Sequence, residues 1–306
     1  MPLAIVLPFV PFVESILTAM RICRFGEGRL GVVDGTGVRD VTAALDDLPA
    51  CRYPLPAHDI LVAHLATLRP RIERLATQAA PIPLSDVRLR SPVANPGKII
   101  AAPVNYQTHL QEVRGDPQLH HGNPSHTVTI HTAGVFLKAS SSIAGAGDGI
   151  AICQPERRTD HEVELACVIG REVRGVAASD ALGCVAGYAI GLDITIRGSE
   201  DRSLRKSPDS YSVLGPWLVT ADELGDPGAL DLELWVNGAL RQRSNTRHMI
   251  LGVAELIALA SGFYTLRPGD IIYTGTPDGV GPIVAGDTIR AAISGVGSME
   301  VSVHGD

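Results

Sequence analysis

The apolar and polar positions of the chain follow two different periods in its N-terminal part. Three short runs alternate with the period of two that is typical of strands, and Gly-rich turns separate them: residues 21–25, 30–33 and 38–41. Residues 59–78 repeat their apolar positions with helical spacing, and Pro70 is expected to break this helix before it resumes at Ile72. The proline-rich stretch over residues 81–96 indicates a domain boundary.

Beyond this boundary the pattern is mostly that of strands and turns. Buried strands are predicted over residues 98–101, 162–169, 185–195, 216–220, 230–236, 270–274 and 299–303. Two helices are expected, one near residues 179–181 and one over residues 247–261. The fold is therefore expected to be α+β and mainly β, with residues 20–93 as a small N-terminal α+β domain and residues 94–306 as the larger domain.

The first nineteen residues are strongly apolar but do not form a complete export signal. They lack a positively charged start, and they contain three prolines and Glu14. We expect residues 1–19 to be an apolar leader outside the fold, with the functional start at Met20. An export signal is the alternative interpretation.

Composition narrows the class of partner. The 306 residues carry a formal net charge of −7, and no dense run of Lys and Arg appears, so neither a nucleic acid nor an anionic membrane is expected as partner. The five cysteines are odd in number and show no CxxC spacing, which favours free thiols in a reducing compartment. A cytoplasmic protein with a small-molecule partner is expected.

Glu162 and Glu164 are the most informative pair of residues. They are separated by one residue in a predicted strand, so their side chains share one face. Val163 and Leu165 indicate that the strand lies in the core, where two adjacent carboxylates are costly without a cation. A divalent cation held by oxygen ligands would remove that cost. An exposed face with two unpaired glutamates is the alternative, and spacing alone does not decide between them.

Three further residues carry candidate chemistry. Asp193 ends a long apolar run; it either starts a turn or completes a three-carboxylate site with the two glutamates. His109 and Glu112 would be neighbours on one helical turn, where a carboxylate orients an imidazole as a water-activating base requires. The same spacing is also common on solvated helices.

Other motifs point to turns and loops. GEGRLG at residues 26–31 matches a dinucleotide-binding string, but a strand follows it where a helix is required, so a hairpin turn is expected. Residues 113–134 contain four histidines without a metal-ligand spacing and favour a mobile surface loop or lid. TGTPDGVG at residues 274–281 lacks the lysine of a phosphate-binding loop.

The order of these motifs is itself specific. Asn105, Tyr106, His109 and Glu112 are followed by FLKASS at 136–141, DHEVELA at 160–166, Asp193, Arg197, Lys206, Gln242 and TGTPDGVG. In this order the pieces resemble the fumarylacetoacetate hydrolase superfamily over about residues 98–303. Residues 101–103 depart from the family pattern, and the segment 113–134 is longer than in its smallest members.

The resemblance implies a mixed β-roll or sandwich catalytic domain in a homodimer. It implies that Mg²⁺ or Mn²⁺, or Ca²⁺ in some members, is held by Glu162, Glu164 and Asp193. His109 and Glu112 would lie on a lid and activate water, with Lys206 as a third catalytic residue. The matching positions that would line the substrate pocket are Tyr106, Lys138, Arg197, Gln242 and Thr276.

The function implied is divalent-metal-dependent hydrolysis of a carbon–carbon bond in a dioxo acid such as an acylpyruvate. An isomerase or decarboxylase of a 2-hydroxymuconate-type or 2-oxo acid from aromatic degradation is the alternative, because it would use the same three carboxylates. The stretch over residues 193–203 is similar to that of such isomerases. A relative that binds a ligand without catalysis is a third possibility, and it would make the His109–Glu112 pair dispensable.

Overall fold

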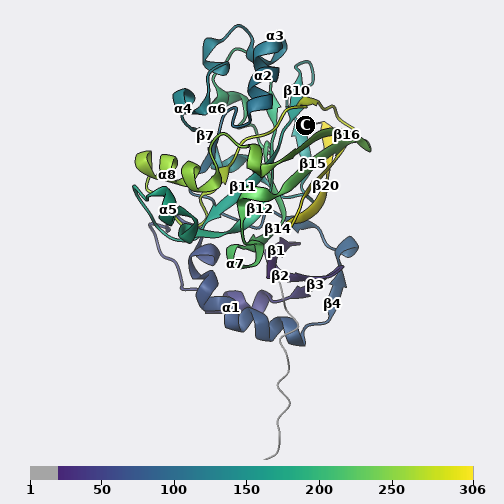
Figure 1. The fold of residues 1–306 in the computed structure, drawn as a ribbon. Helices are drawn as coiled ribbons and strands as arrows, with labels where there is room; N and C mark the ends of the chain where they lie inside the picture. Colours follow the sequence, from purple (N-terminus) through teal and green to yellow (C-terminus); the bar gives the residue numbers. More distant parts are fainter. Residues whose placement is uncertain (1–19, 306) are drawn as a thin grey trace, which may run out of the picture.

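The computed structural model describes residues 20–305, so the leader predicted over residues 1–19 lies outside the described residues. The largest element is a sheet with the strand order β4-β3-β2-β1-β14-β12-β11-β17-β6-β7, in which β5 also pairs with β1 and β8 with β14 (Figure 1). Its strands are β1 (Arg21–Phe25), β2 (Arg29–Asp34), β3 (Gly37–Asp40), β4 (Pro81–Pro83), β5 (Leu89–Arg90), β6 (Ile99–Ala101), β7 (Phe136–Lys138), β8 (Ile143–Ala144), β11 (Val163–Ile169), β12 (Val185–Asp193), β14 (Ser212–Thr220) and β17 (Ile271–Tyr273).

Two smaller sheets and several helices complete the fold. A five-stranded sheet contains β16 (Ala239–Asn245), β15 (Asp231–Val236), β19 (Thr288–Ile293), β20 (Gly297–Gly305) and β9 (Ile150–Ile152). A three-stranded sheet contains β13 (Thr195–Ile196), β10 (Thr159–His161) and β18 (Gly281–Pro282). The helices are α1 (Ile60–Gln78), α2 (Gln107–Gly115), α3 (Pro117–His120), α4 (Ile130–Ala133), α5 (Ala178–Ala181), α6 (Arg202–Arg205), α7 (Ala221–Leu224) and α8 (Val253–Phe263).

The two faces of the large sheet are buried in two separate cores. Along β11, Leu165 and Cys167 pack into a core shared with the five-stranded sheet and α8. Ala166 and Val168 point to the other face and pack with the buried side of α1. This alternation is the period of two expected of a strand that is buried on both faces. Glu162 and Glu164 fall on the same face as Ala166, beyond the end of the α1 core.

The α+β and mainly β fold expected from the sequence is confirmed. The strands predicted at both ends of the chain are present, and GEGRLG forms the turn of the β1–β2 hairpin. β1 pairs with β14, with Arg21 opposite Val219, so the described residues of both predicted domains contribute to one sheet. The proposed division near residue 93 stays a prediction.

Two predicted helices differ from the structure. α1 continues through Pro70, although proline cannot donate the hydrogen bond to the carbonyl four residues earlier. Its buried face runs unbroken across the proline, from Val62 to Ala76, and this packing holds the helix together. The helix expected from residue 247 begins only at Val253, because the Glu255 carboxylate accepts the N–H of Gly252 and caps the helix there.

Strand boundaries also shift where tertiary pairing decides them. The strand expected over residues 185–195 ends at Asp193, and Thr195 and Ile196 pair instead with β10. β14 starts at Ser212 and is longer than the run over residues 216–220 suggests. The segment over residues 107–133, here called the cap segment, forms α2, α3, a 3₁₀ turn at Pro124–His126 and α4. The surface loop expected there is therefore replaced by short helices.

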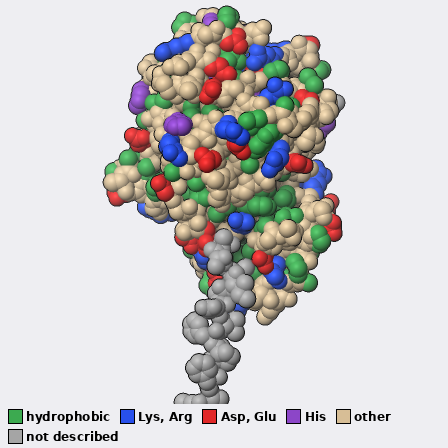
Figure 2. Space-filling model, turned by 45° about the vertical axis from the view of Figure 1, so that its right-hand side comes forward, with side chains coloured by type: hydrophobic (Ala, Val, Ile, Leu, Met, Phe, Trp, Pro, Cys, Tyr) green, Lys and Arg blue, Asp and Glu red, His purple; other side chains and the backbone are tan. Residues whose placement is uncertain are grey.

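The outer surface shows a mixed charge pattern on the face drawn in Figure 2, where acidic and basic side chains lie among one another. Among residues 20–305, no helix combines the length and apolar character that a membrane crossing requires. In Figure 1, α1 and β1–β4 lie at one end of the molecule and the cap segment at the other, so the site described next lies far from the N-terminal strands.

Candidate active site

Three carboxylates from the neighbouring strands β11 and β12 converge at one end of the large sheet. The antiparallel register places Glu164 opposite Gly191, and the N–H of Asp193 donates to the carbonyl oxygen of Glu162 over 2.9 Å. Glu162, Glu164 and Asp193 therefore share one face, with one oxygen atom of each within 4.8 Å of the others. All three are buried.

Two lysine side chains pair with these carboxylates. Nζ of Lys206 donates to Oε2 of Glu162 and to Oδ2 of Asp193, each over 2.7 Å. Nζ of Lys138 donates to the other oxygen of Asp193 over 2.5 Å and to the Tyr211 carbonyl oxygen over 2.7 Å. Burial lowers the pKa of Lys138 in spite of the neighbouring Asp193 charge.

The two glutamates have opposite electrostatic surroundings. Burial raises the pKa of Glu164, and the charges of Asp193 and Glu162 raise it further. Its Oε2 accepts the N–H of Gly275 over 2.6 Å. For Glu162, burial also favours the neutral form, but the positive charges of Lys206 and Arg197 outweigh it and hold the pKa below its usual range. Of the three carboxylates, Glu164 is the one that forms no ion pair with a side-chain cation among the described residues.

The donor set fits a divalent cation. Three buried carboxylates offer hard oxygen ligands from a rigid pair of strands, which suits Mg²⁺, Mn²⁺ or Ca²⁺. The excess negative charge at Glu164 is the feature that a bound cation would relieve. Glu162, Glu164 and Asp193 would hold such an ion.

His109 and Glu112 form the pair that the helical spacing predicts. Both lie on α2, and Nδ1 of His109 lies 2.8 Å from Oε2 of Glu112. The other oxygen of Glu112 accepts the N–H of Gly279 over 2.9 Å, which ties α2 to the loop after β17. With Nδ1 donating to a carboxylate, Nε2 of His109 is left as the proton acceptor.

Arg197 connects the carboxylate cluster to a second acidic side chain. Its Nε donates to Oδ2 of Asp160 over 2.8 Å and its Nη2 to Oε1 of Glu162 over 2.9 Å. Asp160 is fully buried and also accepts two hydrogen bonds from Arg158. Arg197 therefore has both of its charge partners within the protein.

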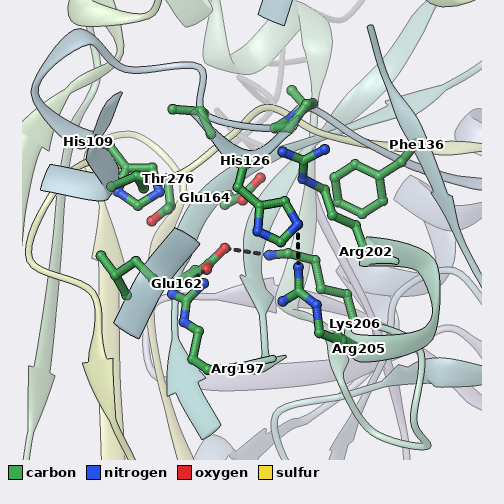
Figure 3. A pocket seen from close by; sticks show the side chains of 15 residues that line it. His109, His126, Phe136, Glu162, Glu164, Arg197, Arg202, Arg205, Lys206 and Thr276 are labelled. Carbon is green, nitrogen blue, oxygen red and sulfur yellow. Dashed lines mark hydrogen bonds and ion pairs between the residues drawn. The ribbon is translucent and has the colours of Figure 1, made fainter. Parts of the chain in front are cut away.

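A cavity of about 40 Å³ lies between the carboxylate cluster and the cap segment. It is lined by Ala102, Pro103, Val104, His109, Val113, Leu119, His126, Phe136, Glu162, Glu164, Arg197, Arg202, Arg205, Lys206 and Thr276 (Figure 3). Figure 3 shows His109 and Thr276 on one side of it, and Phe136, Arg202 and Arg205 on the other. The structure thus brings five charged or catalytic candidates to one cavity: His109, Glu162, Glu164, Arg197 and Lys206.

Thr276, a sixth predicted residue, also lines the cavity, whereas Tyr106, Lys138 and Gln242 do not. The Gln242 amide is used inside the protein: its oxygen accepts the N–H of Val163, and its nitrogen donates to the Thr276 hydroxyl. Lys138 is held against Asp193, and Tyr106 is fully buried, with its hydroxyl among the atoms without a hydrogen-bond partner in the described residues. The substrate-binding role of Tyr106, Lys138 and Gln242 stays a prediction.

Nine cavity residues were not predicted as site residues, and four of them have charged, imidazole or aromatic side chains: His126, Phe136, Arg202 and Arg205. The two arginines lie three residues apart, a spacing that puts both on one side of a helical turn. Since α6 is only one turn long, its helical character was not visible in the apolar pattern. His126 is buried, although it belongs to the segment expected to be a surface loop.

Comparison with known families and curated proteins finds the same family that the order of motifs resembles. The family model described as "Fumarylacetoacetate (FAA) hydrolase C-terminal" matches residues 98–304. The chain is 57% identical over 285 residues to the maleylpyruvate hydrolase of Aquipseudomonas alcaligenes, which covers 93% of this chain and 99% of that protein.

Solved structures show the same similarity. Maleylpyruvate hydrolase from Sphingobium sp. SYK-6, in complex with manganese(II) and pyruvate, is 44% identical with a TM-score of 0.79, covering 94% of this chain and 100% of that one. A 5-carboxymethyl-2-hydroxymuconate delta-isomerase from Mycobacterium smegmatis is 29% identical with a TM-score of 0.67, with the same coverage of 94% and 100%.

Proposed function

Since the chain belongs to the fumarylacetoacetate hydrolase family, we propose that it hydrolyses maleylpyruvate to maleate and pyruvate. The observation that carries this proposal is that His109 and two of the three clustered carboxylates line the same cavity. A base that activates water and a site for a divalent cation are the two components that this hydrolysis requires. The 57% identity to a maleylpyruvate hydrolase supports the choice of substrate.

The chain's own residues account for the proton transfers. Glu112 holds Nδ1 of His109, so Nε2 takes a proton from the attacking water. The water oxygen bonds to the acyl carbonyl carbon, and the carbon–carbon bond to the adjacent methylene then breaks. The electron pair leaves on the pyruvate half, and the proton held by His109 returns to its methylene carbon. Lys206 and Lys138 keep Glu162 and Asp193 in place through these steps.

We assign Glu162, Glu164 and Asp193 as ligands of a divalent cation, Mn²⁺ or Mg²⁺, with Ca²⁺ as a further option. When bound, the cation supplies Lewis-acid stabilisation for the negative charge that develops on the pyruvate half. The manganese complex of the Sphingobium enzyme supports Mn²⁺.

The small cavity favours a movement of the cap segment when the substrate enters. The cavity of about 40 Å³ holds only a few water molecules, since each needs about 10–15 Å³ of such space. The proposed reaction therefore includes an opening of the cap segment that admits the substrate and then returns His109 to the carboxylates.

The test is hydrolysis of maleylpyruvate in ¹⁸O-labelled water with Mn²⁺ present. Equal amounts of maleate and pyruvate, with one ¹⁸O atom in the maleate, are expected from attack of water on the acyl carbonyl. His109→Gln should abolish turnover, whereas His131→Gln, which changes an exposed histidine of the same cap segment, should not. A product with the mass of the substrate would instead indicate an isomerase, and release of CO₂ would indicate a decarboxylase.

The same proposal includes a cytoplasmic homodimer. The five free cysteines support a reducing compartment, and the family resemblance supports the dimer. Sedimentation of the purified chain would measure its oligomeric state directly.

A further inference from the structure

The charges that line the cavity do not balance. Among the described residues, four cationic side chains line it, Arg197, Arg202, Arg205 and Lys206, but only two carboxylates do, Glu162 and Glu164. Arg197 and Lys206 are paired with acidic side chains, as described above. The excess positive charge therefore belongs to Arg202 and Arg205.

These two guanidinium groups have only neutral partners among residues 20–305. Nη2 of Arg202 donates to the Ser125 carbonyl oxygen over 2.7 Å. Arg205 donates to the carbonyl oxygens of Glu200 and Ile196, over 2.8 and 3.1 Å. The nearby Glu200 carboxylate binds Arg157 and forms no ion pair with either arginine. Arg205 is buried and Arg202 half-buried, and a guanidinium group that is shielded from water without an ion-pair partner is costly unless an anion joins it.

The short helix α6 aims both arginines at the cavity. The Asp201 side chain accepts the N–H of Ser203 and fixes the start of the helix. Arg202 and Arg205 are three residues apart, so their side chains leave the same side of the turn. Figure 3 shows both guanidinium groups beside His126, on the side of the cavity opposite His109.

His126 adds no compensating charge to this cluster. Its Nε2 accepts a hydrogen bond from Nη2 of Arg205 over 3.3 Å. Burial, together with the charges of Arg202 and Arg205, lowers the pKa of His126 to about 4, so the imidazole is neutral at pH 7. Burial and the neighbouring Arg197 likewise lower the pKa of Arg205 to about 10, which is the signature of crowded positive charge.

We propose that Arg202 and Arg205 form a subsite for a second carboxylate at the far end of the substrate. The enzyme then prefers acylpyruvates whose acyl group ends in a carboxylate over those whose acyl group is uncharged. Two guanidinium groups that converge on one cavity wall offer several parallel N–H donors, which suit a planar carboxylate. Arg197, Lys206 and the carboxylate cluster remain for the 2-oxo acid end. This inference rests on the proposed hydrolysis of an acylpyruvate.

The experiment compares kcat/KM for maleylpyruvate and for acetylpyruvate, which lacks the far carboxylate, with Mn²⁺ present. For the wild-type chain, the ratio of the two values should be about tenfold or more, since a charge-assisted contact is worth about 1.5–3 kcal/mol and tenfold corresponds to about 1.4 kcal/mol. Arg202→Gln should lower this ratio by about tenfold or more. Arg205→Lys, which keeps the charge but loses the planar fork, should lower it less than Arg205→Gln does.

Arg114→Gln is the matched control. Nε of Arg114 also donates to a carbonyl oxygen of the cap segment, that of Thr127 over 3.0 Å, but Arg114 is exposed and outside the cavity wall. If Arg202 merely ties down the cap segment, both variants should lower the activity on both substrates and leave the ratio unchanged. That result would overturn the subsite.

The remaining outcomes separate the two proposals. An equal loss of activity on both substrates in the Arg202 and Arg205 variants would place these residues at the 2-oxo acid end and refute the far subsite. A wild-type ratio near one would also refute it, without reference to any variant. A wild-type chain that cleaves neither substrate would overturn the proposed function itself, and the subsite with it.

Discussion

Glu112 and Gly279 are joined by a hydrogen bond of 2.9 Å between a carboxylate oxygen and a backbone N–H, across 167 positions of the chain. The second oxygen of the same carboxylate holds His109. Glu112 therefore fixes the imidazole relative to the loop after β17 as well as on its own helix. Loss of either contact should change the catalytic rate more than the stability of the fold.

Glu112→Gln tests the contact with His109. Gly279 and His109 face different oxygens of Glu112, so when the amide oxygen of Gln accepts the N–H of Gly279, its NH₂ group faces Nδ1 of His109. The imidazole then favours the tautomer with a proton on Nε2, which cannot accept a proton from water. We expect kcat for maleylpyruvate to fall by about 10²–10⁴, by analogy with the loss of an orienting carboxylate in other hydrolases, with KM little changed.

The control for this prediction is Glu156→Gln, which removes an exposed carboxylate outside the cavity and should leave kcat unchanged. A Glu112→Gln enzyme with the wild-type kcat would show that His109 does not need this orientation, and so would argue against its assignment as the base.

Glu164→Gln should change stability in opposite directions with and without a metal. Burial and the charges of Asp193 and Glu162 raise the pKa of this carboxyl group in the folded protein. A raised carboxyl pKa destabilises the fold above the unfolded-state value of about 4.3, so at pH 7 the neutral amide should stabilise the metal-free protein, by about 1 kcal/mol. With Mn²⁺ present the variant should be the less stable form, because it lacks one ligand.

Denaturant unfolding in EDTA and in Mn²⁺ measures this reversal, and calorimetric titration should show that Mn²⁺ affinity falls by about 10²-fold or more. Glu172→Gln, at an exposed carboxylate paired with Arg267, should leave both quantities unchanged. Equal Mn²⁺ affinity in the Glu164 variant would remove this residue from the ligand set.

The sequence predicts most of the carboxylate cluster because the spacing of residues that are close in the chain places their side chains together. Glu162 and Glu164 share a face through the period of two in a strand, and His109 and Glu112 meet through one helical turn. The position of Asp193 beside them follows once β11 and β12 pair as neighbours. Family resemblance adds the order of these motifs, which spacing alone does not supply.

What the sequence did not reveal depends on contacts between distant segments. Lys138 meets Asp193 across 55 positions, and Arg205 meets His126 across 79. The apolar pattern does not encode such pairs, because they form only when the strands and the cap segment have packed. For the same reason α1 continues through Pro70, because the packing of its buried face outweighs the low helix propensity of proline.

Lys138→Met should destabilise the metal-free protein far more than the metal-bound protein. Lys138 is buried and its ammonium group compensates the charge of buried Asp193. Removal of one partner from a buried ion pair costs about 3–5 kcal/mol when the remaining charge is left unpaired. Because Lys206 still pairs with Asp193, the cost for Lys138→Met should lie at the lower end of this range. A cation held by Asp193 supplies positive charge in its place, so the difference from wild type should shrink in Mn²⁺.

Lys98→Met provides a matched pair for comparison. Nζ of Lys98 lies 2.6 Å from Oδ2 of the buried Asp270, outside the candidate site. The loss of stability caused by Lys98→Met, measured by denaturant unfolding, should be the same in EDTA and in Mn²⁺. If Lys138→Met behaved in this metal-independent way, Asp193 would not be a ligand.

Gly279→Ala should lower kcat by moving the N–H that holds Glu112. Gly279 has a φ of +92°, and a Cβ atom there would lie 2.2 Å from the Arg241 carbonyl oxygen, so the loop must shift. Gly286 has a similar φ of +98° but open space around it. Gly286→Ala should therefore share only the backbone cost, of about 1 kcal/mol in stability, and keep the wild-type kcat. Thermal unfolding and steady-state kinetics on both variants separate the two effects. If Gly279→Ala lost stability but kept kcat, the hydrogen bond to Glu112 would be dispensable for the orientation of His109.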